Sequence, residues 1–521
     1  MAQKVLIIGG GLGGLVCGAI LAKEGYSVRI FEKHTTAGGG LHTFMRYGVE
    51  WETGMHVISG FQQNGALRRL FSYLEIFDKL HIKPKNSDGF DVVYINSDGR
   101  SYKMAAGRKN FVETLGSYFP EEKDNIRRYI DRVYEICDNI ELFNLKTPAS
   151  NNYEKLKMTS ISVNELIASY VTNPKLQTLL AYNVSLYGGE FDKTPAFVGA
   201  LITQFYIEGA SRFVAGSRQL ADALIEVIEQ NGGEVITGNG VNFIDVHDKK
   251  IQKIIADDGR EFSADRYISA IHPSTMFKLM DITKMPTKAY RQRIDSIPNS
   301  YSSFITFIKF KPNTFPYLNY SAYYVRDYSL IWKGANYDGG EEWPHGCMCD
   351  TPPVTEDDKY AQKMIISAAM NFDDVRKWEN TTVEKRGDDY IAFKKQYENK
   401  LIDAAEKLFP DLRSAIDDVF SATPLTIRDY YGAKEGAIYG TKLDCQNFAA
   451  SQIPVRTKLN NLLLTGQNIN LHGILGVPVT SVLTCAELLG LEYLIKAINN
   501  VKTRHALSPT KDEACLNSNK P

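Results

Sequence analysis

KVLIIGGGLGGLVCGAILAKEGYSVRIFE, residues 4–32, is the stretch of sequence that decides the fold. A β-branched apolar run leads into a GxGxxG motif that starts at Gly9, and a helical pattern over 12–24 and a second strand pattern over 27–32 follow. This order of strand, glycine turn, helix and strand predicts a βαβ dinucleotide-binding unit. A lone GxGxxG motif is weak evidence, but the complete unit favours a binding site over a glycine-rich turn that binds nothing.

Four residues of this unit have physical roles that their spacing predicts. Gly9 allows the sharp turn from strand to helix, Gly11 lets the backbone approach a pyrophosphate, and Gly14 lets the helix lie close to the sheet. The free N–H groups and the positive dipole end of the helix then face the phosphates. Glu32, 23 positions after Gly9, would accept a hydrogen bond from a ribose 2′-hydroxyl, which favours an adenosine half without a 2′-phosphate.

The residues after Glu32 indicate which dinucleotide is bound. A second glycine cluster occupies residues 38–40, and Glu52-Thr-Gly-Met-His56 follows it. A cluster at this distance is not part of the NAD fingerprint. It resembles the extended motif of the flavin-dependent amine oxidase and phytoene desaturase superfamily, and residues 32–56 are most similar to its branch of all-trans-retinol 13,14-reductases (retinol saturases) and carotenoid isomerases. The resemblance implies an FAD cofactor whose phosphates and ribityl chain lie near the glycine pair.

Two departures and one histidine refine this resemblance. Many amine oxidases place two arginines around the glycine pair, where this chain has Thr36 and Gly40. Their absence argues against an amine oxidase and agrees with the saturase-like branch. His56 matches the family's loop beside the cofactor and is the best catalytic candidate, although a structural hydrogen bond from its ring is an equal alternative. Glu52 and His472 are weaker candidates.

The C-terminal part of the chain resembles the same superfamily. Residues 462–468 have the pattern of a strand that runs into a loop, and 472–480 lead into an apolar helix expected over about 481–497. The resemblance implies that the strand brings a polar side chain to the flavin ribityl hydroxyls and that the helix N-terminus points at the pyrimidine edge. Asn468 stands where relatives commonly carry Asp, and an amide can still hydrogen-bond a hydroxyl.

A third segment completes the expected cofactor domain. Residues 217–230 have an amphipathic helical pattern that stops at Asn231-Gly-Gly. Three strand-like runs follow, over 234–237, 241–244 and 250–256, and 266–273 return to the main sheet. The resemblance implies that this helix and an antiparallel meander cover the adenine, with Val241 contacting the ring through its backbone.

The resemblance therefore implies that FAD is bound non-covalently by residues from three separate segments. Relatives with covalent flavin use a cysteine just before the last helix, and residues 474–478 contain none. No second dinucleotide fingerprint is present, so NAD(P)H would bind only transiently as an electron donor. The expected cofactor-binding residues are Gly9, Gly11, Leu12, Gly13, Gly14, Glu32, Lys33, Gly39, Gly40, Leu41, His56, Val241, Gly466, Asn468, Gly476 and Val477.

Composition limits the class of protein. The formal net charge of −1 and the lack of basic tracts give no reason to expect nucleic acid as a partner. Seven scattered cysteines do not form a disulfide framework, and Cys347-Met-Cys349 is interpreted as reduced thiols rather than as a metal site.

Residues 5–22 carry no charge, but six of these eighteen residues are glycine, so they are a strand plus a helix and not a membrane span. We expect a cytoplasmic protein that can contact a membrane peripherally, and the sequence does not specify its oligomeric state.

The predicted fold class is α/β: a Rossmann-type FAD-binding domain with a parallel sheet and a β-meander, plus an inserted mixed α+β substrate domain. In this prediction the FAD-binding domain comprises 1–64, 201–284 and 446–500, the substrate domain comprises 65–200 and 285–445, and 501–521 form a disordered tail. The apolar segment 194–206, the run 304–310, which alternates like a strand with one apolar face, and the tyrosine-rich segment 317–324 would wall a long hydrophobic tunnel, although plain core is the more common role of such segments. Segment 194–206 would form the mouth of this tunnel, with Phe197 and Leu201 facing a membrane.

The expected function is an FAD-dependent oxidoreductase that acts on carbon–carbon double bonds of an apolar isoprenoid or polyene lipid. A saturase is the leading hypothesis, and a desaturase or a carotenoid cis-trans isomerase would share the same cofactor motifs. An amine oxidase is a more distant alternative. A non-catalytic prenyl-lipid carrier of the GDP-dissociation-inhibitor type is the other, and the complete phosphate turn argues against it.

Overall fold

The fold is built around a parallel sheet of five short strands. The computed structural model describes residues 2–147, 158–281, 283, 288–337 and 343–500. Every pair of neighbouring strands in this sheet is parallel, which requires crossover connections on its faces. The strand order is β19 (Leu462–Leu464), β13 (Arg266–Ser269), β1 (Lys4–Ile8), β2 (Ser27–Phe31) and β9 (Glu234–Ile236).

The predicted βαβ unit is confirmed. β1 and β2 pair in parallel, and α1 (Leu12–Lys23) connects them. Residues 13–22 of α1 are all buried, because α16 (Gly473–Leu489) packs on one side of the helix and α9 (Arg218–Gln230) on another. This double coverage explains why α1 is apolar all round instead of amphipathic.

The predicted meander is wrong in its first strand. Residues 234–236 form β9, which pairs in parallel with β2 at the edge of the main sheet. The chain reaches β9 through α9, and such a helical crossover returns a strand parallel to its partner. The antiparallel meander consists of β10 (Val241–His247), β11 (Lys250–Ala256) and β12 (Glu261–Phe262).

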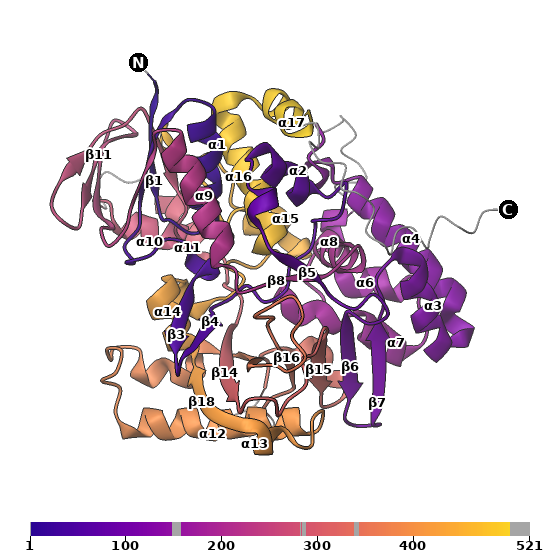
Figure 1. Cartoon of the computed structure of the whole chain (residues 1–521). Coiled ribbons are helices and arrows are strands. Elements are labelled where there is room, and N and C mark those ends of the chain that lie inside the picture. Colours follow the sequence, from indigo (N-terminus) through magenta and orange to yellow (C-terminus); the bar gives the residue numbers. More distant parts are fainter. Residues whose placement is uncertain (1, 148–157, 282, 284–287, 338–342, 501–521) are drawn as a thin grey trace.

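A second sheet of seven strands lies below the parallel sheet in Figure 1. Helix α12 (Asp388–Glu406) packs on it and shares a hydrophobic core with it. Its strand β14 is buried on both faces, whereas the alternating pattern of residues 304–310 predicted one apolar face. The order is β18 (Ile416–Ala422), β14 (Ser302–Phe310), β17 (Lys363–Met370), β16 (Gly346–Asp350), β15 (Ser321–Val325), β6 (Asp91–Ile95) and β7 (Arg100–Met104).

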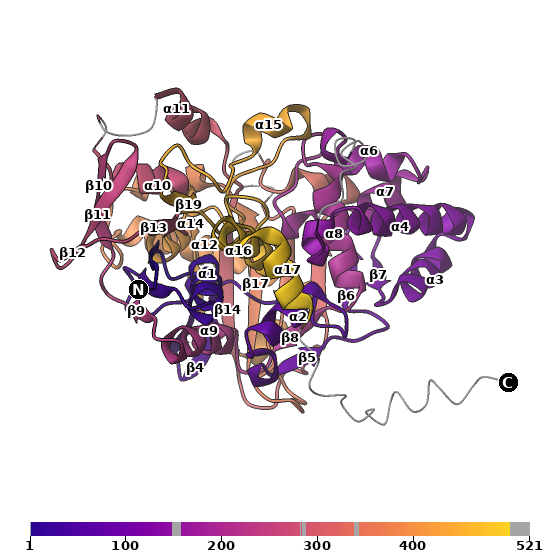
Figure 2. The same cartoon turned by 90° about the horizontal axis from the view of Figure 1, so that it is seen from above.

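A group of helices fills the side of the molecule next to this sheet (Figure 2). The buried side chains of these helices belong to the same hydrophobic core as α1, α9 and α16. The region expected as one substrate domain thus has a helical part that is continuous with the cofactor core. Residues of β6, β7 and β15, among them Val93 and Tyr102, belong to that core too, and other residues of the sheet form a separate core with α12. The helices are α2 (Ala66–Tyr73), α3 (Arg108–Tyr118), α4 (Lys123–Asp138), α6 (Val163–Ala168), α7 (Pro174–Leu180) and α8 (Ala196–Ile207).

The remaining elements are short. Two small antiparallel sheets join β3 (Thr43–Arg46) to β4 (Val49–Glu52) and β5 (Ile82–Pro84) to β8 (Ser211–Phe213). The other helices are α10 (Pro273–Lys278), α11 (Lys288–Ser296), α13 (Leu412–Ala415), α14 (Pro424–Tyr431), α15 (Phe448–Ser451) and α17 (Leu491–Asn499). The domain boundaries stay a prediction, and the predicted disordered tail, 501–521, lies outside the described residues.

The start of the last helix differs from the prediction. The apolar pattern predicted one helix over about 481–497, but the structure has two. Helix α16 already begins at Gly473, contains Pro478 and ends at Leu489, and α17 starts after Gly490. Gly490 has a φ of +86°, a conformation that breaks a helix and that glycine adopts readily. The N-terminus of the helix therefore lies directly after the loop at 466–472.

The predicted membrane-facing role of α8 is wrong. Phe197 is 7% exposed and Leu201 is 4% exposed, and both belong to the main hydrophobic core. Within the described ranges, no helix is long and apolar enough to cross a membrane. The six cysteines in the described part of the chain are all free and buried.

Replacing Leu201 with Ala tests this burial. We expect the free energy of unfolding to fall by about 2–5 kcal/mol, because the change leaves a cavity in a packed core. Chemical denaturation followed by circular dichroism measures the loss. Met45→Ala is the matched control, since Met45 is 68% exposed and its replacement should change stability by less than about 0.5 kcal/mol. A Leu201→Ala variant as stable as the parent would place Leu201 at the surface.

Candidate active site

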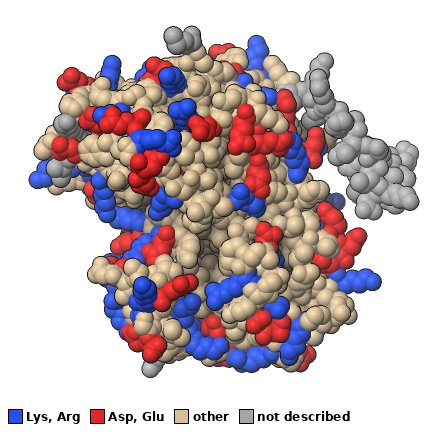
Figure 3. Space-filling view, turned by 60° about the vertical axis from the view of Figure 1, so that its left-hand side comes forward, with Lys and Arg blue, Asp and Glu red and all other residues tan. Residues whose placement is uncertain are grey.

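One cavity of about 550 Å³ lies at the carboxyl ends of the parallel strands. Residues of β1, β2 and β19 or of the loops that follow these strands line one part of it, and residues of β14, β16 and β17 line another. Ligands of open parallel sheets bind at this edge. Figure 3 shows one face of the molecule, on which a hollowed and mostly uncharged zone separates two charged parts.

The glycine turn forms one end of the cavity. Gly11 precedes α1 as its N-cap without a capping side chain, so first-turn N–H groups of the helix have no side-chain partner there. A Cβ atom at Gly40 would meet nothing within 4 Å, and one at Gly11 would come no closer than 4.0 Å to Gly39. The space in front of these backbones is therefore open to a ligand, and the free N–H groups suit phosphate oxygens.

Glu32 is held in place beside the turn. Its Oε2 atom accepts a hydrogen bond from the backbone N–H of Gly10 at 2.8 Å, and its Oε1 atom accepts one from the N–H of His34, also at 2.8 Å. Lys33 and Val241 line the same end of the cavity. A carboxylate fixed in this way matches a ribose hydroxyl next to an adenine.

The C-terminal loop forms the other polar end. Asn468 lines the cavity, and its Oδ1 atom is buried without a hydrogen-bond partner in the described structure. His472 is the N-cap of α16 but makes no side-chain capping bond there, so the first turn of this helix also lacks a capping side chain. An unpartnered amide oxygen and a helix N-terminus fit a ribityl hydroxyl and an electron-rich ring edge, so these residues are compatible with an FAD.

The structure brings together all but two of the predicted cofactor-binding residues. Gly14 and Gly476 do not line the cavity. A Cβ atom at Gly14 would lie 2.0 Å from the carbonyl oxygen of Gly9, and one at Gly476 would lie 2.3 Å from that of Leu471. These two glycines thus allow the close backbone packing that shapes the cavity. The binding roles of the other fourteen residues stay a prediction.

An apolar arm of the cavity reaches into the region between α8 and the seven-stranded sheet. The sequence indicated two of its walls, the apolar run that becomes α8 and the strand pattern over 304–310, which lies in β14. Met348 and Ser367 were missed because each belongs to an ordinary strand pattern. We define the arm by Leu186, Ile202, Phe205, Tyr206, Ser303, Ile305, Met348, Ser367, Ile427 and Ile438.

Two tyrosines that sequence reasoning missed also line the cavity. Tyr431 ends α14, and Tyr439 follows in the next loop. Burial raises the pKa of both phenols above the ordinary value, so both hydroxyls keep their protons. Only their positions in three dimensions reveal them, since tyrosines are frequent throughout this chain.

His56 and His472 both line the cavity, but their environments differ. The Nδ1 atom of His56 is buried without a hydrogen bond and lies 3.6 Å from the Oε2 atom of Glu52. Burial lowers the pKa of His472 to about 4, and its Nε2–H faces the carbonyl oxygen of Leu186 at 3.3 Å. His472 is therefore neutral near pH 7, and His56 is the better candidate for proton transfer.

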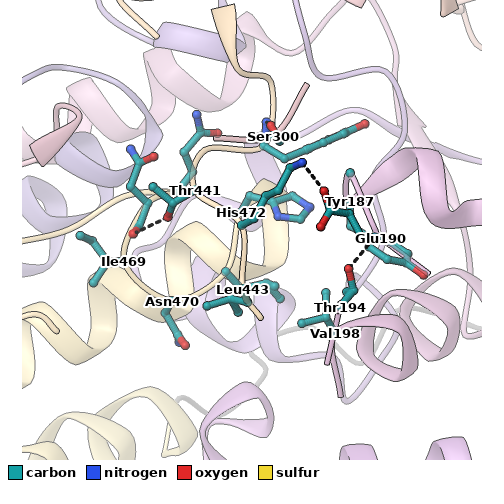
Figure 4. Close-up of a pocket in the computed structure, with 16 residues that line it drawn as sticks. Tyr187, Glu190, Thr194, Val198, Ser300, Thr441, Leu443, Ile469, Asn470 and His472 are labelled. Carbon is teal, nitrogen blue, oxygen red and sulfur yellow. Dashed lines mark hydrogen bonds and ion pairs between the residues drawn. The ribbon is translucent and has the colours of Figure 1, made fainter. Parts of the chain in front are cut away.

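A side cavity of about 30 Å³ adjoins the main cavity near His472 and is drawn in Figure 4. Asn468, His472 and Tyr439 line both cavities. Lys442 and Glu190, which both line it, form an ion pair. The side cavity has room and polar partners for a water molecule, but not for a substrate.

Comparisons with known proteins agree with this geometry. A family model described as flavin containing amine oxidoreductase matches residues 12–392. The chain is 26% identical over 524 residues to all-trans-retinol 13,14-reductase of Danio rerio, covering 93% of this chain and 85% of that one. It is 26% identical over 298 residues to the chloroplastic prolycopene isomerase 2 of an Oncidium hybrid cultivar, covering 54% of this chain and 50% of that one. An oxidoreductase structure from Methanosarcina mazei superposes with a TM-score of 0.61 at 18% identity, covering 92% of this chain and 99% of that one, and shows the same fold.

A graded pair of variants at Gly11 tests the glycine turn. Gly11→Ala adds a Cβ atom that has room, whereas the branched side chain of Gly11→Val would project into the space in front of the helix N-terminus. We expect Gly11→Val to be purified without flavin and Gly11→Ala to keep at least part of it. Absorbance at the flavin band per protein chain measures the occupancy, and circular dichroism checks the fold. A normal flavin content in Gly11→Val would show that the cofactor binds elsewhere.

Proposed function

The chain belongs to the family of flavin containing amine oxidoreductases and is a flavin-dependent oxidoreductase, and on this premise we propose that it saturates a carbon–carbon double bond of an apolar polyene lipid. Two hydrogens would be added across the bond, as in the reaction named for the retinol 13,14-reductases to which the chain is similar. The substrate would be an isoprenoid with conjugated double bonds.

The observation that carries this proposal is the apolar arm that opens from the polar cofactor cavity. Its lining consists mainly of aliphatic and aromatic side chains and includes no carboxylate among the described residues. A conjugated hydrocarbon chain gains free energy by leaving water for such a surface. A cationic amine would lose its hydration there without meeting an anion, so the arm favours a lipid over an amine.

We propose that the cofactor is a non-covalently bound FAD. The glycine turn would hold its phosphates, Glu32 the adenosine ribose, and Asn468 the ribityl chain. When bound and reduced, the flavin supplies a hydride to a carbon of the substrate. His56 would donate the proton that the neighbouring carbon needs, because it lines the cavity near these segments.

The extent of the similarity supports reduction over isomerisation. The match to the retinol reductase covers 93% of this chain, and that to the prolycopene isomerase covers 54%. The longer match includes the sheet that supplies four of the ten residues of the apolar arm. A desaturase or an isomerase remains the second candidate, because both would use the same cofactor cavity. A lipid carrier without flavin has no need for the intact phosphate turn.

Partners and location follow from the substrate. We propose that NAD(P)H or a protein that it reduces delivers electrons in a transient encounter, since the sequence contains one dinucleotide fingerprint. We also propose a cytoplasmic protein that contacts membranes peripherally, because a polyene must leave a lipid phase to enter the arm. The contact surface is not the one predicted on α8, whose Phe197 and Leu201 are buried.

Product mass distinguishes the three reactions. Photoreduced enzyme is incubated without oxygen with all-trans-retinol and, separately, with a carotene, and the products are analysed by mass spectrometry. We expect a product heavier by two hydrogens from the polyene that reacts. A product lighter by two hydrogens, formed by oxidised enzyme, would identify a desaturase. An unchanged mass with a shifted absorption maximum would identify an isomerase.

Acid precipitation tests the mode of flavin attachment. We expect all of the yellow colour to stay in the supernatant, because residues 474–478 offer no cysteine to the flavin ring. Chromatography of the supernatant against FAD and FMN standards identifies the flavin. Colour that remains in the pellet after washing with denaturant would contradict non-covalent binding, and FMN in the supernatant would contradict the adenosine site at Glu32.

A further inference from the structure

We propose that Glu52 is the positioning residue of His56, which it holds through Nδ1 so that Nε2 faces the substrate. The inference rests on the proposed function, because it concerns the proton that double-bond reduction requires. Glu52 does not line the cavity and would act only through the histidine.

The two side chains lie next to each other, with His56 in the cavity lining and Glu52 behind it. Glu52 is the last residue of β4, and its side chain is 3% exposed, against 11% for His56. Their Oε2 and Nδ1 atoms are 3.6 Å apart, and Nδ1 has no hydrogen-bond partner in the described structure. Catalytic hydrogen bonds are often long before ligands bind and shorten in the complex.

Glu52 is enclosed by backbone and by one other charged side chain. A Cβ atom at Gly216, which precedes α9, would lie 3.6 Å from its Oε1 atom. On the side of the seven-stranded sheet lies Lys363, a buried residue whose Nζ atom donates a hydrogen bond to the carbonyl oxygen of Glu50 at 2.6 Å. Burial lowers the pKa of Lys363, and the negative charges of Glu52 and Glu50 act against this decrease. The carboxylate of Glu52 therefore has two possible cationic partners, Lys363 and protonated His56.

The pairing with His56 has a direct chemical consequence. A carboxylate removed from water is stabilised by a nearby positive charge, so it favours a proton on Nδ1 and fixes the plane of the ring. Nε2 is then the nitrogen that can donate its proton to a substrate carbon. The step needs His56 as the imidazolium, with a proton on each ring nitrogen. The Nε2–H bond breaks and a C–H bond forms, the ring becomes neutral with its remaining proton on Nδ1, and the adjacent carbon would take the hydride that reduced flavin supplies when bound. A hydronium ion or a buffer acid from solvent then returns a proton to Nε2, and Nδ1–H stays paired with Glu52 throughout.

A purely structural role of Glu52 predicts different effects of its replacement. Glu52 would then only neutralise Lys363 and hold β4 against β17, and its loss would act on stability whether or not His56 were present. A double-mutant cycle separates the two roles, because residues that act through one another have non-additive effects on the rate.

The test compares Glu52→Gln, His56→Gln and the double variant, each loaded with flavin. The rate of all-trans-retinol reduction is measured in single turnovers with photoreduced enzyme. We expect His56→Gln to slow reduction by about 10²–10⁴-fold and Glu52→Gln by about 10–100-fold, with flavin content unchanged. In the His56→Gln background, Glu52→Gln should change the rate by less than about twofold. With His56 present, Glu52→Asp should keep part of the rate that Glu52→Gln loses.

Glu50→Gln is the matched control, because it removes an exposed carboxylate from the same strand and should keep the parental rate. Multiplicative effects of the two variants, or recovery of Glu52→Gln by an added Lys363→Met, would overturn the inference in favour of the structural role. A parental rate in His56→Gln would instead refute the proton donor of the proposed function. A parental rate in Glu52→Gln with a slow His56→Gln would refute only the positioning role.

Crystal structures of the flavin-loaded parent and of Glu52→Gln give a readout that does not depend on turnover. We expect Nδ1 of His56 to lie about 3 Å from the Glu52 carboxylate in the parent. In the variant the ring should rotate or occupy two positions. An imidazole that turns Nδ1 away from Glu52 in the parent, or that keeps its position in the variant, would overturn the inference even if retinol is not the substrate.

Discussion

The contact between Gly13 and Gly466 is the constraint on which the rest of the structure depends. A Cβ atom at Gly13 would lie 2.9 Å from the Cα atom of Gly466, so any side chain there would push the two backbones apart. The hydroxyl of Ser481 strengthens the contact by donating to the carbonyl oxygen of Gly13 at 3.1 Å. Through this approach the first turn of α1 and the loop after β19, more than 400 residues apart, become one wall of the cavity.

A buried polar network joins the small β5–β8 sheet to the seven-stranded sheet. Lys85 donates to Asp91 at 2.7 Å and to Ser321 at 2.8 Å, and Ser321 donates to Asp350 at 2.9 Å. Arg212 forms an ion pair with Asp350. Breaking a buried pair is costly, so this network resists changes in how β5 and β8 sit on β6, β15 and β16, and α8 leads directly into β8. The apolar arm, which lies between α8 and this sheet, keeps a defined shape as a result.

The parts of the site that could be predicted are those in which neighbouring residues act together. The phosphate turn, Glu32 and the loop at 466–477 each form within a short segment, and the structure places them around one cavity. The helix start at Gly473 was missed because a proline at position 478 is a common sign of a helix boundary, and burial of α16 tolerates it here. The role of α8 was mispredicted because an apolar run has the same composition in a core as at a membrane surface.

The sequence by itself determined the cofactor chemistry, since backbone N–H groups, glycine turns and a nearby acid act over distances that a single βαβ unit spans. Only the tertiary structure decided where a lipid can lie and which side chains face the reaction. The arm joins Phe205 from a helix to Ser303 and Met348 from two strands of a sheet. Lys363 likewise reaches β4 across more than 300 residues, where its Nζ atom donates to the carbonyl oxygen of Glu50. Such meetings depend on the packing of whole elements, and no local pattern of residues specifies that packing.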